Sequence, residues 1–155
     1  MADLLFRDAT HADIATILTL GHAGDSRGAA APPLDQATLG DPRYRAALDE
    51  IDADPAHRLI VVEKAGEIIG TLQISIIPGL PQFGLKRGLL EHVHIRPDQR
   101  GTGYGSAMVQ WAIERCREAG CEMVQLTSNN IRTDAHRFYA RLGFKPTHAG
   151  FKLQL

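Results

Sequence analysis

Several features that mark other protein classes are scarce in this sequence of 155 residues. No apolar run approaches the roughly 20 residues that a membrane-spanning helix needs. The net charge is -1, so no excess of basic residues points to nucleic acid. The first residues lack the basic-then-apolar layout of a signal peptide, and the sequence has only two cysteines, Cys116 and Cys121. We therefore expect a cytoplasmic protein with free thiols that binds neither nucleic acid nor membrane.

What the sequence does contain is typical of one globular domain. Hydrophobic residues make up 44% of the chain and charged residues 23%, which is ordinary for a folded protein. The length suffices for a single core. We expect one domain over residues 1–155.

The most informative stretch is a glycine-rich turn between a strand and a helix. The alternation of Leu89, Glu91, Val93 and Ile95 predicts a strand in which these residues share one face. Glycines then occupy every second position from 101 to 105, directly before a helical pattern. Glycines let the backbone turn tightly, and the first N–H groups of a helix have no internal partner. The turn therefore predicts a main-chain cradle for phosphate.

Two well-known phosphate loops do not fit this turn. A P-loop needs a lysine after its glycines, and none follows here. The dinucleotide fingerprint would need glycine at the position of Ser106, and it usually lies on the first strand of a domain.

Two motifs resemble those of the GNAT family of N-acetyltransferases. Residues 100–105, Arg-Gly-Thr-Gly-Tyr-Gly, resemble its Arg/Gln-x-x-Gly-x-Gly/Ala loop, which holds the pyrophosphate of acetyl-CoA. Residues 135–144, Ala-His-Arg-Phe-Tyr-Ala-Arg-Leu-Gly-Phe, resemble its Ala-x-x-Phe-Tyr-x-x-x-Gly-Phe motif at the usual distance downstream. The resemblance covers the whole chain.

The order of expected elements agrees with that resemblance. We expect strands over 4–9, 58–64, 68–77, 85–95, 123–127 and 151–155, and helices after Thr10, over 42–53, after Gly105 and over 133–142. The segment 22–41 carries little pattern, and in this family it commonly shapes the acceptor site. The resemblance implies an α/β fold of the α+β type, with a mixed, mostly antiparallel sheet flanked by about four helices. Its two central strands would run parallel and splay apart.

The resemblance also implies the cofactor contacts. Acetyl-CoA would lie in the splay, with its pantetheine arm against the main chain of Val93, His94 and Ile95. The remaining expected cofactor-binding residues are Arg100, Gly101, Thr102, Gly103, Tyr104, Gly105, Ser106, Asn129, Asn130 and Arg132. Arg132 stands where the family often has asparagine. Either Asn129 or Asn130 takes the pantetheine contact, or Arg132 reaches a phosphate.

Acetyl transfer to an amine needs a base and benefits from an acid. Glu91 fits the family's glutamate position and is the candidate base, acting through a water. The alternative is that Glu91 is a solvated strand carboxylate without a catalytic role. Tyr139, from the Phe-Tyr pair, is the candidate acid. The alternative is that Tyr139 is a core tyrosine with a packing role only. His92 and His94 are expected on the strand face opposite Glu91. A His-x-His pair can bind metal, but no third ligand joins it by spacing, so we expect no metal.

We therefore predict an acetyl-CoA-dependent N-acetyltransferase that acts by direct transfer on a small-molecule or amino-acid-like amine. Acetylation of a protein or peptide amine and a non-catalytic CoA-binding sensor module are the alternatives. The expected partner is the small amine, and a homodimer is left open.

Overall fold

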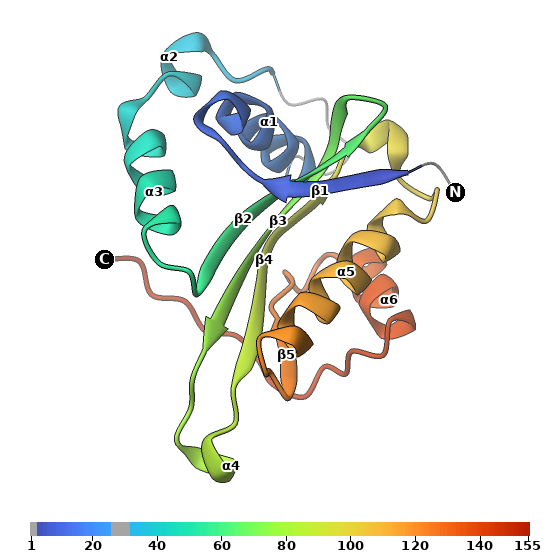
Figure 1. Cartoon of the computed structure of the whole chain (residues 1–155). Coiled ribbons are helices and arrows are strands. Elements are labelled where there is room, and N and C mark those ends of the chain that lie inside the picture. The colour runs from blue at the N-terminus through green and yellow to red at the C-terminus, as the bar shows by residue number, and fades with distance from the viewer. Residues whose placement is uncertain (1–2, 26–31) are drawn as a thin grey trace.

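The structure is a computed structural model that describes residues 3–25 and 32–155 (Figure 1). Its elements are β1 (Leu4–Asp8), α1 (Ile14–Asp25), α2 (Gln36–Leu39), α3 (Pro42–Asp52), β2 (His57–Lys64), β3 (Glu67–Ile77), α4 (Pro81–Gly84), β4 (Arg87–Ile95), α5 (Tyr104–Glu118), β5 (Met123–Leu126) and α6 (Thr133–Arg141). Single 3-10 turns at His11–Asp13 and Pro97–Gln99 precede α1 and follow β4. Residues 26–31, part of the patternless segment expected over 22–41, lie outside the described residues.

Local chemistry explains where these helices begin. The Thr10 backbone N–H donates to Asp13 Oδ2 at 2.8 Å, which supports the turn that leads into α1. Asp41 accepts from the Arg43 backbone N–H at 2.9 Å, and Pro42 occupies the first turn of α3, where its missing N–H costs nothing.

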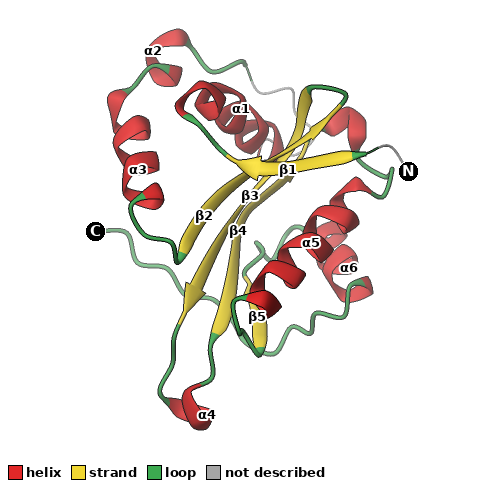
Figure 2. Cartoon of the chain, viewed as in Figure 1, coloured by secondary structure: helices red, strands yellow, loops and turns green. Residues whose placement is uncertain are grey.

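The strands form one mixed sheet in the order β1-β2-β3-β4-β5. All neighbours are antiparallel except β4 and β5, which run parallel. Helices α1 and α3 lie on one face, and α5, with α6 beside it, covers the other (Figure 2). The α/β class that the sequence predicts is confirmed.

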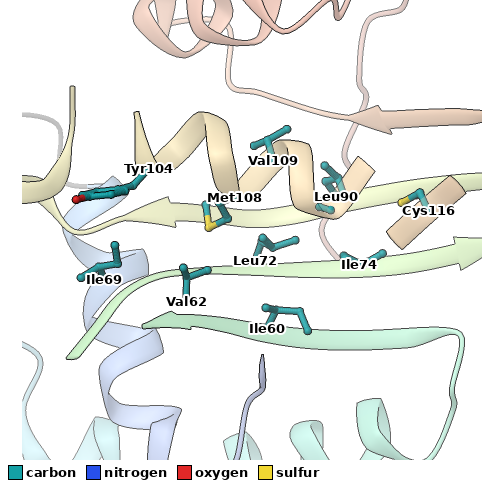
Figure 3. Packing of buried hydrophobic residues seen from close by; sticks show 11 residues of the cluster. Ile60, Val62, Ile69, Leu72, Ile74, Leu90, Tyr104, Met108, Val109 and Cys116 are labelled. Carbon is teal, nitrogen blue, oxygen red and sulfur yellow. The ribbon is translucent and has the colours of Figure 1, made fainter. Parts of the chain in front are cut away.

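The main core lies between the sheet and α5 (Figure 3). Strand alternation directs Ile60 and Val62 of β2 and Leu72 and Ile74 of β3 toward α5, because successive side chains point to opposite faces. The cluster also contains Ile69 of β3, Leu90 of β4, and Tyr104, Met108, Val109, Ala112 and Cys116 of α5. Gly88 lets α5 approach β4, since a Cβ there would lie 2.3 Å from Cys116 Sγ. Cys116 and Cys121 are free thiols, as predicted.

A β-bulge in β4 changes which side chains share a face. Gln73 pairs with Glu91, but Thr71, two residues earlier on β3, pairs with His94, so β4 has one extra residue there. His92 takes a left-handed conformation with φ 50° at the bulge. Paired residues point to the same face, and so do residues two apart in a strand. Glu91 and His94 therefore both face α1.

The predicted grouping of Leu89, Glu91, Val93 and Ile95 on one face is therefore wrong. Ile95 pairs with Gly70 and points toward α5, opposite to Glu91. The placement of His94 opposite Glu91 is wrong for the same reason. Strict alternation holds only where no bulge shifts the phase.

The closing strand expected over 151–155 is also wrong, because these residues have no regular structure. Within residues 3–25 and 32–155, β5 is consequently an edge strand. The parallel pair lies at this edge of the sheet and not at its centre.

Candidate active site

The glycine turn leaves its main chain uncovered. Gly101 and Gly103 have φ of +75° and +90°, conformations that favour glycine. A Cβ built at either position would meet no described heavy atom within 4 Å. A ligand can therefore approach this backbone closely.

The start of α5 adds unpaired donors to the same turn. Gly103 is the N-cap residue and offers no side-chain acceptor, so the first N–H groups of α5 have no cap among the described residues. The helix macrodipole adds roughly half a positive charge at this end. The loop is held from within, since Thr102 Oγ1 donates to the Gln99 carbonyl at 2.6 Å and Arg100 Nε to the Ile95 carbonyl at 3.3 Å. This arrangement suits an anion such as a pyrophosphate.

Tyr104 and Gly105, at the end of the turn, pack against neighbouring residues. Tyr104 is buried, and Lys64 Nζ lies 4.6 Å from the centroid of its ring, so only its main chain faces the turn. A Cβ at Gly105 would lie 3.6 Å from Ile95 Cγ1 and 3.6 Å from the Phe138 ring. Gly105 thus brings the start of α5 close to the end of β4 and to α6.

Within the described chain, the C-terminal half of β4 has an unpaired edge on the side of β5. The parallel pairing begins at Arg87 and Met123 and ends at Leu90 and Leu126, whereas β4 continues to Ile95 and there pairs only with β3. Within the described chain, the main chain of residues 91–95 therefore has no strand partner on that side. This confirms the expected separation of the parallel strands, and an extended ligand can pair with Val93, His94 and Ile95 as an added strand.

Tyr139, the candidate acid, lies on α6. Its ring packs edge-to-face with Phe138 and Phe144, at centroid distances of 5.1 and 5.7 Å. Burial raises the pKa of the Tyr139 phenol, while the charge of Arg132 opposes the shift. The phenol thus keeps its proton at neutral pH and is able to act as an acid.

The loop before α6 contains the polar residues Asn129, Asn130 and Arg132. Asn129 Oδ1 accepts from the Ile131 backbone N–H at 3.2 Å, and the Asn129 carbonyl accepts from Arg132 N–H at 2.9 Å. His136 Nε2 lies 3.0 Å from the same carbonyl, so this histidine holds the loop. Asn130 is exposed, and Arg132 is half-buried near Tyr139.

Glu91 and Tyr139 lie on opposite sides of the sheet. Glu91 is exposed on the α1 face, whereas Tyr139 packs against the core beneath α5. The unpaired main chain of β4 lies between these two faces. This geometry allows two ligands to meet at one edge from two sides.

His94 lies on the same face of β4 as Glu91, whereas strict alternation in the sequence predicts the opposite face. Its ring is 8% exposed and lies against α1, where a Cβ on Gly24 would stand 2.2 Å from Nδ1. The ring centroids of His92 and His94 are 5.7 Å apart. The sequence alone gives no signal of this shift, because Leu89, Glu91, Val93 and Ile95 fit strict alternation.

The described residues contain no group of three or more His, Cys, Asp or Glu side chains placed to hold a metal ion. Among residues 3–25 and 32–155, no helix is long and apolar enough to cross a membrane.

Comparison with known proteins identifies the family. Residues 29–144 match the Acetyltransferase (GNAT) family, a span that covers most of the chain. The chain belongs to this family. It is 34% identical over 109 residues to the aminoalkylphosphonate N-acetyltransferase of Salmonella typhimurium, a match that covers 68% of this chain and 66% of that protein. It is 29% identical to the glucosamine 6-phosphate N-acetyltransferase of Trypanosoma brucei brucei, over 100% of this chain and 98% of that protein.

A solved structure shares the fold. The crystal structure of a transcriptional regulator from Bacillus halodurans C-125 superposes with a TM-score of 0.83 and 37% identity, over 99% of this chain and 100% of that one. GNAT enzymes use acetyl-CoA, and the open cradle and β4 edge fit its pyrophosphate and pantetheine arm. The chain therefore carries an acetyltransferase domain of the kind the sequence motifs predict.

Proposed function

We propose that this chain is a single N-acetyltransferase domain that transfers an acetyl group directly from acetyl-CoA to a small primary amine. The observation that carries the proposal is the open β4 edge, with Tyr139 on one face of the sheet and Glu91 on the other. The co-substrate lies along the cradle and this edge, and the amine arrives from the α1 face. The proposal keeps the cytoplasmic location that the sequence predicts.

Glu91 and Tyr139 have separate roles in proton transfer. Glu91, through a water, accepts a proton from the ammonium, because only the free amine is a nucleophile. The amine nitrogen then attacks the thioester carbonyl, and main-chain N–H groups of the β4 bulge stabilise the developing oxyanion. As the carbon–sulfur bond breaks, Tyr139 gives its proton to the departing thiolate. The nitrogen loses its extra proton, which restores the Tyr139 phenol, and an amide and a free thiol result.

The relatives indicate the kind of acceptor. Both named N-acetyltransferases act, by their names, on small amines that carry a phosphonate or a phosphate. These compounds are the first to test, followed by amino acids. A peptide amine is the alternative acceptor.

The test is a panel of amines assayed for acetyl-CoA-dependent release of free thiol. We expect turnover with a small amine, and Glu91→Gln should lower kcat/KM by about 100-fold, the usual scale for a lost acid–base group. The matched control is Glu122→Gln, which removes another exposed carboxylate outside the site and should keep the full rate.

Two results would contradict the proposal. Binding of acetyl-CoA without thiol release from any amine would favour a CoA-binding sensor module. An unchanged rate in Glu91→Gln would remove Glu91 from the mechanism.

A further inference from the structure

Arg87, the first residue of β4, has a charged side chain without a partner in the described chain. The residue is half-buried, and its Nε is buried and makes no hydrogen bond. Among residues 3–25 and 32–155, no side-chain hydrogen bond or ion pair involves its guanidinium. Three other half-buried arginines, Arg7, Arg58 and Arg96, each form ion pairs with carboxylates. A buried donor without an acceptor is costly, so this guanidinium calls for a group from outside the chain.

The side chain of Arg87 points to the same face of the sheet as Glu91. Gly88, the next residue, points to α5, because a Cβ there would lie 2.3 Å from Cys116 Sγ. Successive residues of a strand point to opposite faces, so Arg87 points to the face of α1. Leu89 and Glu91 follow at steps of two, before the bulge, and share this face. The unpaired arginine and the candidate base therefore lie on one face of one strand.

The spacing between Arg87 and Glu91 suits a small molecule. At about 3.3 Å per residue, their Cα atoms lie about 13 Å apart along β4, and both long side chains can extend into this interval. Leu89 lies between them, and Gln125 of β5 pairs with Leu89 on the same face. Both of these residues are half-buried. A ligand with a short carbon chain can therefore reach from the base to the guanidinium.

The guanidinium determines which chemical group can bind at that end. An arginine stays charged at every physiological pH, and its planar fork of N–H donors matches the oxygens of a carboxylate, phosphonate or phosphate. The terminal nitrogens of Arg87 keep contact with solvent, since Nε is the only buried unpartnered atom of this side chain. An oxyanion can therefore reach these nitrogens without displacing a partner from the described chain.

We propose that Arg87 binds an oxyanion on the acceptor, so that the substrates are primary amines that carry a carboxylate, phosphonate or phosphate. The amine lies at Glu91, the carbon chain lies over Leu89, and the anion accepts hydrogen bonds from Arg87. This inference rests on the proposed function and adds the residue that selects the acceptor. Amines without an anionic group lack this contact and are poorer substrates.

The first test compares amines in pairs with and without the anion. The pairs are 2-aminoethylphosphonate with ethylamine, β-alanine with propylamine, and glucosamine 6-phosphate with glucosamine. In at least one pair, kcat/KM should be about 10-fold or more higher for the anionic amine. Arg87→Gln should raise KM for that amine by about 10–150-fold with kcat nearly unchanged, because a hydrogen bond to a charged group is lost. The neutral amine of the pair should react as with the parent protein.

Two further variants serve as controls. Arg87→Lys keeps the charge without the planar fork and should recover part of the lost affinity. Arg117→Gln removes the same charge from the last turn of α5, where Arg117 pairs with Glu114. This variant should keep the parent KM for both amines of the pair. Thermal melting should show all three variants folded.

A binding measurement separates this inference from the proposed function. Ethylphosphonate, propionate and glucose 6-phosphate carry the anion but lack the amine. Calorimetry at saturating coenzyme A, which occupies the phosphate cradle, should show that at least one of them binds the parent and binds Arg87→Gln at least about 10-fold more weakly. Such binding without turnover of any amine would refute the proposed function and leave the anion site standing.

Three results would overturn the inference itself. Equal kcat/KM for the anionic and neutral amines of every pair would show that the anion is not recognised. An unchanged KM and anion affinity in Arg87→Gln would show that Arg87 does not bind it. Failure of all three anions to bind the parent, together with no turnover of any anionic amine, would have the same meaning.

Discussion

Substituting Gly103 with alanine tests the cofactor cradle, because it separates backbone strain from ligand binding. Gly103 has φ +90°, where a side chain costs about 1–2 kcal/mol. For a chain of this size, that cost lowers the melting temperature by about 2–8 °C. Gly66, in the turn between β2 and β3, has φ +81° and is equally free of neighbours. Gly66→Ala should therefore lose similar stability.

Only Gly103→Ala should weaken acetyl-CoA binding. The new methyl group stands in the open space next to the first N–H groups of α5. Loss of one hydrogen bond to a charged group costs about 1.5–3 kcal/mol, which corresponds to a dissociation constant about 10–150-fold higher. Gly66→Ala should keep the affinity of the parent protein.

Isothermal calorimetry with acetyl-CoA and thermal melting without ligand measure the two effects. If Gly103→Ala binds as tightly as the parent, the phosphates do not use this backbone. If Gly66→Ala loses as much affinity, the loss arises from reduced stability and not from the cradle. Either result would refute the reasoning.

Two further predictions concern the acid and the stability of the N-terminal region. Tyr139→Phe keeps the ring packing and should lower kcat by about 100-fold with acetyl-CoA affinity unchanged, and an unchanged kcat would make Tyr139 a packing residue. The Arg7 guanidinium lies 2.7 Å from the Asp13 carboxylate and lowers the pKa of Asp13. The pair therefore stabilises the fold fully above the unfolded pKa of about 4. This contribution is lost as the pH falls through the lower pKa of the folded state. Asp13→Asn should therefore cost about 1.5–3 kcal/mol of unfolding free energy at pH 7 and less near pH 2, as urea titrations at the two pH values would show. An equal cost at both values would contradict this.

Features that depend on neighbouring residues could be predicted from the sequence. The cradle needs glycines at set positions followed directly by a helix start, so residues 101–105 suffice to indicate it. The helix with Phe138 and Tyr139, the hairpin turn at Gly66 and the pairing of Thr10 with Asp13 are likewise local. Side-chain spacing and backbone preference act over a few residues and are therefore visible in the sequence.

Features that depend on contacts between distant segments could not be predicted. The bulge places two β4 residues, His92 and Val93, opposite the single residue Leu72 of β3. Residues that follow the bulge in β4 therefore point to the face opposite to the one that strict alternation predicts. The packing role of Gly105 depends on Ile95 and Phe138, which come from β4 and α6. The alternation in 151–155 predicts a strand, and the prediction is wrong because these residues have no strand partner in the described chain. A strand is completed by hydrogen bonds to another segment, so the tertiary structure, and not the local pattern, decides whether it exists.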